Sequence, residues 1–554
     1  MAAWAGCAIW RVLDTHFLDG AAFGRIRAAW EQDPDRPAIL HYVAITPTAP
    51  DLTHLCAQTP GRAPPASWST APQATGFHRM ELAGGRVLLT LCVGPLRTQL
   101  REQQFLADTV LLPAMADAQD TTAWDGWTLK ALARLCRRGT VVHLPANAGD
   151  WLPALEQAGF VPDAAPGMLA QTASYAPRWT PGTSRQPWRS PPPAASGCVV
   201  VGAGLAGAAV AAALARRNWR VDVLDAAPAP AAGASGLPAG LLVPQHSRDD
   251  AARSRLSRAG VQLTLQWCQR LLQDGEDWAC TGVRQRVGDG SPDTSLWHAD
   301  AGWVKPARLV AACLAVPGVM FQGGARVHAL VQDAGRWVLL DVAGRELARA
   351  AHVVLATAGD TPTLLEAAST HEARPQPGRR GLRPMAAVHG QVSWGLQHRG
   401  DALHFPPGPV NGHGHLLPAI PIDGAMAWFA GATYEPDTAP RLDEARAHAE
   451  NRQRLAQLVP RTERALAQRF DAGQVRSWRG TRSTTRDRLP AVGPLQDGPA
   501  PTLWMSAGMG SRGLTYAVLC AELLAARLGG EPLPVEGGLA RLLDATRPGV
   551  SHHL

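Results

Sequence analysis

The stretch that decides the fold of this chain is CVVVGAGLAGAAVAAALARRNWRVDVLD, residues Cys198–Asp225. It begins with an apolar β-branched run and continues through G-x-G-x-x-G at Gly202, Gly204 and Gly207, and Asp225 follows the third glycine by 18 residues. This order of strand, glycine turn, helix, second strand and acid is typical of a fold that binds an adenine dinucleotide. We expect the pyrophosphate at the helix N-terminus and Asp225 to accept a hydrogen bond from a ribose hydroxyl.

Each glycine of this turn has its own expected function. Gly202 allows the tight turn, Gly204 lets the backbone approach the pyrophosphate, and Gly207 lets the helix lie close to the strand. Downstream, the segment GASG at Gly233–Gly236 can lie under a large planar cofactor, but it also fits a surface loop. A last glycine turn places helix-start amides near a flavin ring, and its glycines are Gly508, Gly510 and Gly513.

The chain has 554 residues, which exceeds the size of one ordinary domain of about 100–200 residues. A proline-, serine- and arginine-rich segment without apolar periodicity, residues 176–197, predicts a linker. Residues 1–175 therefore form one predicted domain and residues 198–554 another. Within the second domain we assign cofactor-binding parts to about 198–280, 345–380 and 476–545, and substrate-domain parts to about 281–344 and 381–475.

Alternation of strands and helices predicts an α/β fold in both domains. The N-terminal domain is expected to be Rossmann-like, and the C-terminal one to combine a dinucleotide-binding sheet with an inserted antiparallel sheet. Val327 opens the alternating run of that insertion, and Ala351–Gly359 is predicted as a buried strand that returns past the cofactor. In the N-terminal half the predicted strands are Ala8–Leu13, Leu40–Ile45, Val87–Val93, Thr109–Leu112 and Thr140–His143. The predicted helices are Ala21–Trp30, Trp127–Arg137 and Trp151–Gln157.

Composition narrows the class of protein. The content of 46% hydrophobic and 18% charged residues excludes wholesale disorder. The net charge of +7 favours an anionic partner, although the excess of 51 arginines over two lysines can also reflect the base composition of the coding sequence.

Nine cysteines without a C-x-x-C pair indicate a reducing compartment and no cysteine-based metal site. His413 and His415 lack a third ligand at a recognised spacing, so we assign no metal. We find no signal peptide or membrane span and expect a cytoplasmic protein.

Several motifs together narrow the dinucleotide fingerprint to one class. The GASG turn, the ATAG return strand and the terminal GMGSRGLT occur in the order found in FAD proteins of the D-amino-acid oxidase and glycine oxidase class. The segments GASGLPAGLLVP, FAGATYEPD, TRDRLPAVGP and AGMGSRGLTYAVLCAELLA closely resemble the C-terminal half of the bifunctional tRNA 5-methylaminomethyl-2-thiouridine biosynthesis family, MnmC. The resemblance covers about residues 190–545.

This resemblance implies a reaction on tRNA. In the family, FAD serves to oxidise the glycine-like side chain of 5-carboxymethylaminomethyl-(2-thio)uridine at the wobble position, and hydrolysis of the imine leaves the aminomethyl base and glyoxylate. Arg482 and Arg512 match positions where glycine-oxidase-like proteins keep arginines near the substrate carboxylate, although a surface or phosphate-facing arginine fits the pattern too. The expected cofactor contacts are Gly202, Gly204, Gly207, Asp225, Ser235, Gly236, Val327, Gly359, Gly508, Gly510, Ser511, Gly513 and Leu514.

The N-terminal half resembles the S-adenosylmethionine-dependent methyltransferase half of the same family but departs from it where the chemistry occurs. Its glycine-rich loop appears as DTHFLDGAAF at Asp14–Phe23, where His16 and Leu18 replace glycines and Ala22 replaces asparagine. Thr46 replaces the acid that would hold the cofactor ribose, and the family's L-D-G-F segment appears as LPAM at residues 112–115. We therefore predict a lost S-adenosylmethionine site and a catalytically silent domain that serves as a folding partner or as part of the tRNA-binding surface.

Three functions remain open at this point. The first is FAD-dependent removal of the carboxymethyl group from wobble uridine, with tRNA as the partner and a monomer as the expected form. The second is a free-standing oxidase of glycine, sarcosine or another small amino acid. The third is a non-catalytic tRNA-binding scaffold, which the intact glycines at positions 202 to 207 and 508 to 513 argue against.

Overall fold

The structure is a computed structural model that describes residues 4–50, 74–113, 124–145, 152–163, 171–179, 195–286, 295–370, 384–498 and 500–547. The chain divides into two units. The first comprises Met1–Ala194, Gly498–Ala500 and Ala525–Arg541, and the second comprises Ala195–Asp497, Pro501–Leu524 and Leu542–Leu554. Most of the predicted linker at residues 176–197, as well as Ala114 and Met115 of the LPAM segment, lies outside the described residues.

The first unit is built on an eight-stranded sheet with the order β3-β4-β2-β1-β5-β6-β8-β7. Its central strands pair in parallel, β3 is antiparallel to β4, and β8 is antiparallel to both β6 and β7. The strands are β1 Ile9–Asp14, β2 Ile39–Thr46, β3 Gly76–Leu82, β4 Val87–Val93, β5 Ala107–Leu111, β6 Cys136–His143, β7 Phe160–Pro162 and β8 Thr172–Tyr175. The predicted strands are confirmed.

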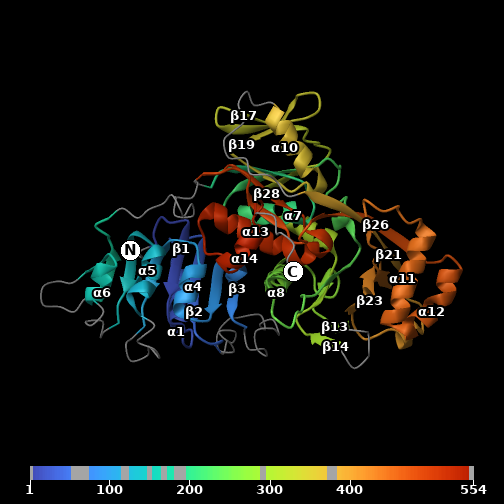
Figure 1. Ribbon diagram of the computed structural model, residues 1–554, viewed down its shortest axis with the longest axis horizontal. Helices are drawn as coiled ribbons and strands as arrows, with labels where there is room; N and C mark the ends of the chain where they lie inside the picture. Colours follow the sequence, from blue (N-terminus) through green and yellow to red (C-terminus); the bar gives the residue numbers. More distant parts are fainter. Residues whose placement is uncertain are drawn as a thin grey trace. The chain divides into compact units, whose positions relative to one another are not determined.

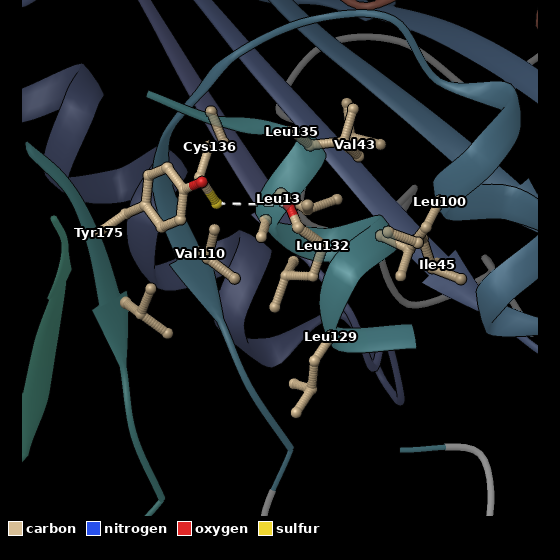
Figure 2. Packing of buried hydrophobic residues seen from close by; sticks show 14 of the residues in the cluster. Leu13, Val43, Ile45, Leu100, Val110, Leu129, Leu132, Leu135, Cys136 and Tyr175 are labelled. Carbon is tan, nitrogen blue, oxygen red and sulfur yellow. Dashed lines mark hydrogen bonds between the residues drawn. The ribbon is translucent and has the colours of Figure 1, made fainter. Parts of the chain in front are cut away.

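Helices cover this sheet on both sides, so β2 and β4 are buried along their whole length. The helices are α1 Ala21–Gln32, α4 Leu96–Glu102, α5 Gly126–Arg134 and α6 Leu152–Gln157. Helix α5 ends three residues before its predicted end, because Cys136 already begins β6. Figure 2 shows Leu129 and Leu132 of α5 packed against the sheet residue Val110, with the Cys136 thiol donating to the Leu132 carbonyl at 3.4 Å.

The end of the chain contributes to this first unit. Helix α13, Gly513–Gly529, is followed by a segment whose residues are buried within the N-terminal fold. Nε2 of His41 lies 3.0 Å from Oε2 of Glu531, and both side chains are fully buried. Arg79 donates to the carbonyl of Pro532 at 2.7 Å. The first unit is therefore completed by residues about 450 positions distant in sequence, which the local patterns did not indicate.

The second unit contains the predicted dinucleotide fold. Its six-stranded sheet has the order β16-β10-β9-β20-β28-β27, with β27 the only antiparallel member of this sheet. The strands are β9 Gly197–Val201, β10 Arg220–Leu224, β16 Val319–Gln322, β20 His352–Leu355, β27 Ala491–Pro494 and β28 Leu503–Ala507. Helix α7, Leu205–Ala215, follows β9 and packs against α9, Pro306–Leu314. The return strand predicted at Ala351–Gly359 is β20, which pairs in parallel with β9 and β28.

A second, mainly antiparallel sheet has the order β14-β13-β22-β23-β24-β21-β25, with β26 paired to β21. Its strands are β13 Val283–Arg286, β14 Ser295–His298, β21 Met385–Leu396, β22 Val410–Gly412, β23 Gly414–Ile422, β24 Ala425–Gly431, β25 Glu435–Pro436 and β26 Arg476–Thr485. The sequence patterns predict that residues from about 476 onward belong to the cofactor-binding part. In the structure, β26 instead belongs to the antiparallel sheet, because it pairs with β21 along ten residues.

Two helices pack on this sheet. They are α11, Glu444–Leu458, and α12, Pro460–Asp471, drawn in orange in Figure 1. The break between them falls at Pro460, which occupies the first turn of α12, where proline is tolerated because that amide has no partner within the helix. Their apolar residues join those of β23 and β24 in one cluster.

A three-stranded meander forms a separate sheet with the order β17-β18-β19. Its strands are β17 Ala329–Asp333, β18 Arg336–Leu340 and β19 Glu346–Ala350, and α10, Thr361–Thr370, follows β20. The sequence placed most of this meander in the substrate domain. Instead, Leu330, Trp337 and Leu339 share a hydrophobic cluster with Val199 and Leu355 of the six-stranded sheet.

The remaining elements of the second unit connect its sheets. A small sheet combines β11 Gly240–Leu242, β12 Trp278–Ala279 and β15 Gly302–Val304, and the long helix is α8 Ala252–Leu271. Thr264 of α8 donates to the Leu514 carbonyl at 2.8 Å, so α8 supports the start of α13. None of the helices in the described ranges is long and apolar enough to cross a membrane.

Candidate functional site

A cavity of about 1020 Å³ opens in the second unit, where the turns after β9, β20 and β28 face the antiparallel sheet. Ligand pockets commonly measure about 300–1,000 Å³, so this volume suits a dinucleotide together with a second ligand. Ten of the thirteen predicted cofactor positions line it, and these are Gly202, Gly204, Asp225, Ser235, Val327, Gly508, Gly510, Ser511, Gly513 and Leu514. The two predicted arginines, Arg482 and Arg512, line it as well.

The first glycine turn positions α7 at one end of this cavity. Gly202 has a φ of 108°, and a Cβ there would lie 2.5 Å from the carbonyl oxygen of Ala356. A Cβ on Gly207 would overlap with the carbonyl oxygen of Gly202, which fits its expected role in helix packing. Gly204 differs from both, because a Cβ there would meet only Ser235 Oγ, at 3.2 Å. Gly204 therefore leaves space on the cavity side, as the approach of a pyrophosphate requires.

Two polar side chains hold the surrounding loops. Oδ2 of Asp225 accepts from the amide of Ala203 at 2.6 Å, and Oδ1 accepts from the amide of Ala227 at 2.8 Å. A carboxylate oxygen has further lone-pair capacity, so Asp225 remains able to accept from a ribose hydroxyl. Oγ of Ser235 accepts from the amide of Leu205 at 2.9 Å, in the first turn of α7. Both residues fit a dinucleotide site and also shape it.

Three predicted cofactor residues do not line the cavity. Gly207 is buried in α7, and Gly236 lies in a turn where a Cβ would approach the Ala231 carbonyl oxygen to 2.7 Å. Gly359 is flanked by lining residues, and a Cβ there would meet no atom within 4 Å. The first two glycines thus serve packing and turn geometry. Gly359 lies beside the cavity without contributing to its lining.

Two guanidinium groups in this cavity have no carboxylate partner among the residues that the structure describes. Nη2 of Arg482, on β26, donates to the carbonyl of Thr433 at 3.0 Å, and Nη1 of Arg512 donates to the carbonyl of Val243 at 3.3 Å. Burial lowers the pKa of both arginines, although each remains a cation at neutral pH. Buried cations are ordinarily paired, so the cavity offers two positive groups to an anionic ligand.

The position of Arg482 depends on a glycine that the sequence did not single out. Strands β21 and β26 pair so that Gly390 faces Gly480, and Arg482 is opposite Val388. A Cβ on Gly390 would overlap with Nη2 of Arg482 and approach the Thr433 carbonyl oxygen to 2.7 Å. The guanidinium therefore occupies the space that a side chain at position 390 would fill. No local signal marks Gly390, because its partner is 92 residues away.

His415, which no sequence pattern marked as a site residue, also lines this cavity. Burial lowers its pKa to about 4, with Arg482 contributing in the same direction. Its Nε2 is buried without a hydrogen-bond partner, so a neutral imidazole is available to a bound ligand. His413, in contrast, is exposed and lies 3.4 Å from Gln457 Oε1. Among the described residues, no group of three His, Cys, Asp or Glu side chains could hold a metal.

In the first unit, the segment after β1 occupies the edge where a Rossmann fold binds its cofactor. Thr15 donates to the carbonyl of Leu111 through its amide at 3.2 Å and its hydroxyl at 2.8 Å. The amide of Phe17 donates to Ile45 at 3.0 Å, and the phenyl ring is buried. These bonds join the loop to β5 on one side of β1 and to β2 on the other.

The acid at the end of β1 is bound internally. Oδ2 of Asp14 accepts from the Tyr42 hydroxyl at 2.6 Å, and Oδ1 accepts from the amide of His16 at 3.0 Å. Burial raises the pKa of Asp14. Thr46, which replaces the ribose-binding acid, donates its hydroxyl to Thr48 at 2.6 Å. The carboxylate of Asp14 and the hydroxyl of Thr46 thus bond to the protein itself, whereas Nε2 of His16 is buried without a hydrogen-bond partner among the described residues.

Known proteins match both units of the chain. The family described as FAD dependent oxidoreductase, DAO, matches residues 198–286 and 278–527. A protein of Albidiferax ferrireducens named tRNA 5-methylaminomethyl-2-thiouridine biosynthesis bifunctional protein MnmC is 47% identical over 99% of this chain and 95% of its own length. A protein of the same name from Polaromonas naphthalenivorans is 44% identical over 99% of this chain and 91% of its own.

Among solved structures, glycine oxidase from Geobacillus kaustophilus is similar to 63% of this chain and 98% of its own, with 20% identity and a TM-score of 0.48.

Proposed function

Because this chain belongs to the MnmC family and carries its FAD-dependent oxidoreductase domain, we propose that it removes the carboxymethyl group from 5-carboxymethylaminomethyl-(2-thio)uridine at the tRNA wobble position. The product is the 5-aminomethyl base, and the released fragment is glyoxylate. The partner is tRNA, an anion that suits the net charge of +7. We also propose that the protein acts in the cytoplasm as a monomer.

The observation that carries this proposal is the pair of guanidiniums of Arg482 and Arg512, which hydrogen-bond only to backbone carbonyls within the described part of the chain. The reacting arm of the substrate ends in a carboxylate next to the carbon that is oxidised. An arginine fork binds a carboxylate through two parallel hydrogen bonds, which fixes both its position and its orientation. When the carboxylate is held in this way, the C–H bond of the neighbouring carbon is aligned before the reaction begins.

The residues present fit FAD. Gly204 leaves room for a pyrophosphate at the N-terminus of α7, Asp225 can accept from the ribose, and Gly508, Gly510 and Gly513 line the same cavity. When bound, FAD would accept the hydride, which carries the two electrons that leave the secondary amine. The protein's own contribution is to bind the carboxylate and to present the arm. His415, neutral at physiological pH, supplies a polar atom beside Arg482.

The bonds broken and formed balance without a metal or a second cofactor. Oxidation converts the C–N single bond of the arm to an imine with loss of a hydride and a proton. Water then adds to the imine carbon, and the carbon–nitrogen bond breaks to give a primary amine and glyoxylate. The amine stays on the uridine.

Loss of this protein from cells is expected to cause accumulation of the carboxymethylaminomethyl uridine in tRNA. Mass spectrometry of tRNA nucleosides measures this level directly, and reintroduction of the intact chain should restore it. Unchanged levels would instead favour a free-standing oxidase of glycine or sarcosine, which the purified protein would reveal by releasing glyoxylate from those amino acids. A purified protein without flavin absorbance that cannot be reconstituted with FAD would favour the non-catalytic scaffold.

We further propose that the N-terminal unit has lost its S-adenosylmethionine site. In support, His16 and Leu18 stand at glycine positions of the family loop, and Thr15 and Phe17 bond across the strand ends where the nucleoside would bind. Calorimetric titration with S-adenosylmethionine should therefore give no saturable heat, while the same sample keeps its flavin. Saturable binding in the micromolar range would show that the site survives.

A further inference from the structure

A second cavity, of about 230 Å³, adjoins the first in the C-terminal unit. Both cavities share the residues Tyr434, Arg482, Met509, Gly510, Ser511 and Arg512. The second cavity adds two arginines to this set, Arg253 of α8 and Arg488 of the turn between β26 and β27. Four guanidinium groups thus line one small space, and none of the residues lining it is acidic. Such a concentration of positive charge calls for an anionic ligand.

These four arginines fall into two pairs by exposure. Arg482 and Arg512 are partly buried, and they face the main cavity, where the substrate carboxylate is expected. Arg253 and Arg488 are exposed and line only the second cavity. The carboxylate that acts electrostatically on Arg482 belongs to Glu435, whose two oxygens accept from Thr433 Oγ1 at 2.6 Å and from the Leu442 amide at 3.0 Å. Arg253 and Arg488, the outer pair, line only the second cavity, so they suit a second anion.

The backbone holds Arg488 in an unusual conformation. Its φ of 58° lies in the left-handed region, which costs a residue other than glycine or asparagine roughly 1 kcal/mol or more. Its amide donates to the Thr485 carbonyl at 3.0 Å, which closes the turn. The side chain of Arg488 is thereby directed by a turn that a glycine would adopt without strain.

The preceding residue, Asp487, fixes this turn. Its Oδ1 accepts from Thr485 Oγ1 at 2.8 Å and from the amide of Leu489 at 3.2 Å, while Nε and Nη2 of Arg547 bind both of its oxygens at 2.9 and 2.7 Å. Burial alone would raise the pKa of Asp487, but these hydrogen bonds lower it to about 2. Asp487 is therefore ionised and engaged, and it holds the turn in place. Its backbone carbonyl accepts from Nη2 of Arg253 at 2.9 Å.

An aromatic ring lies where the two cavities meet. Tyr434 lines both and is 49% exposed, which is unusual for a large ring beside a buried site. Exposed aromatic rings next to arginines provide the stacking surface on which proteins bind unpaired bases of RNA. The modified nucleotide carries a base, a reacting arm and a phosphate. The base matches Tyr434, the arm matches the main cavity, and the phosphate matches the outer arginines, Arg253 and Arg488.

We propose that this second cavity binds a backbone phosphate of the RNA next to the modified nucleoside, through Arg253 and Arg488. The proposal rests on the function proposed above and specifies its substrate class: a nucleotide within an RNA strand, recognised by two anions at once. A free amino acid or a free nucleoside offers only the inner anion. The outer arginines thus determine specificity for RNA and take no part in the oxidation.

The test compares Arg488→Gly with the intact chain on two substrates. Glycine keeps the left-handed turn without strain and removes only the side chain. For tRNA that carries the carboxymethylaminomethyl uridine, KM from glyoxylate release should rise about tenfold at unchanged kcat. The salt dependence, log KM against log salt concentration, should become shallower by about 0.7, the value for one phosphate contact with single-stranded nucleic acid. For the free modified nucleoside, KM should not change.

Two further measurements complete the design. Arg464→Ala removes one positive charge from an exposed site on α12 outside both cavities, so it should leave KM for tRNA unchanged. Fluorescence anisotropy of a labelled anticodon stem-loop measures RNA binding without turnover, and Arg253→Ala and Arg488→Gly should each weaken it several-fold.

The outcomes separate the two proposals. Equal losses for tRNA and nucleoside in Arg488→Gly would place the substrate carboxylate in the second cavity and overturn the phosphate site. Unchanged RNA binding and unchanged KM would overturn it as well, while turnover of tRNA by the intact chain would leave the proposed function standing. If the intact chain bound the stem-loop through these arginines but released no glyoxylate from tRNA, the phosphate site would stand and the proposed reaction would fail.

Discussion

Replacement of Arg482 by alanine is expected to lower kcat/KM for the modified tRNA by roughly 100-fold or more. Loss of one partner from a buried ion pair costs about 3–5 kcal/mol, and 1.4 kcal/mol corresponds to a factor of ten. Arg512 remains in the variant and water can fill the vacated space, so the lower end of this range applies. Because the Arg482 guanidinium is bound only to the Thr433 carbonyl, the protein should lose little stability.

The change should appear mainly as a higher KM, with FAD still bound, since Arg482 contacts none of the residues of the first glycine turn in the described hydrogen bonds. Arg476→Ala is the matched control: it removes an exposed arginine from the same strand, outside both cavities. Gly390→Ala should reproduce the Arg482 effect, because a Cβ at position 390 displaces the guanidinium. A near-normal KM in Arg482→Ala would contradict the proposed contact between Arg482 and the substrate carboxylate and would favour a surface role for this residue.

Local sequence patterns predicted the dinucleotide fold because each part of the signal is short-range. The strand, turn and helix from Cys198 to Asp225 depend on residues at fixed small spacings, so their order can be found without knowing the rest of the fold. Gly207 illustrates the limit of this reading. The motif marks it as part of the cofactor site, but the structure places it against the Gly202 carbonyl, outside the cavity lining.

The substrate side of the site could not be predicted in the same way. Gly390 accommodates Arg482 only because β21 and β26 pair in one particular register across about 90 residues of sequence. His415 and Tyr434 also line the cavity, and although Tyr434 stands in the FAGATYEPD segment, nothing in either local sequence marks these side chains as cavity residues. Arg488 belongs to the TRDRLP segment, but only the φ value of its turn and the cavity beside it distinguish it from the other arginines.

The two Rossmann-type sheets of this chain differ in what closes the carboxyl ends of their strands. After β9, the backbone turns through three glycines and leaves space beside Gly204. After β1, the backbone bonds to both neighbouring strands through Thr15 and Phe17. A glycine loop and a self-bonded loop can follow the same strand topology, so the sheet alone does not decide whether a nucleotide binds.

Replacement of Gly204 by valine is expected to give a folded protein that lacks flavin. Its φ of −81° and ψ of −175° are open to any residue, and a Cβ would meet only Ser235 Oγ at 3.2 Å, so the backbone tolerates the change. The added side chain, however, fills the space where the pyrophosphate approaches. Overpacking of this kind costs about 3 kcal/mol, or more than 100-fold in FAD affinity.

Flavin absorbance per protein and the midpoint of thermal unfolding without added FAD measure these two effects separately. Gly359→Val is the matched control, because position 359 lies beside the cavity, lines none of it, and has no atom within 4 Å of a Cβ. That variant should keep its FAD. Gly202→Ala should instead lose stability, since its φ is 108° and its Cβ would approach the Ala356 carbonyl oxygen to 2.5 Å. Full flavin content in Gly204→Val would show that the pyrophosphate does not pass this glycine and would move the cofactor away from the N-terminus of α7.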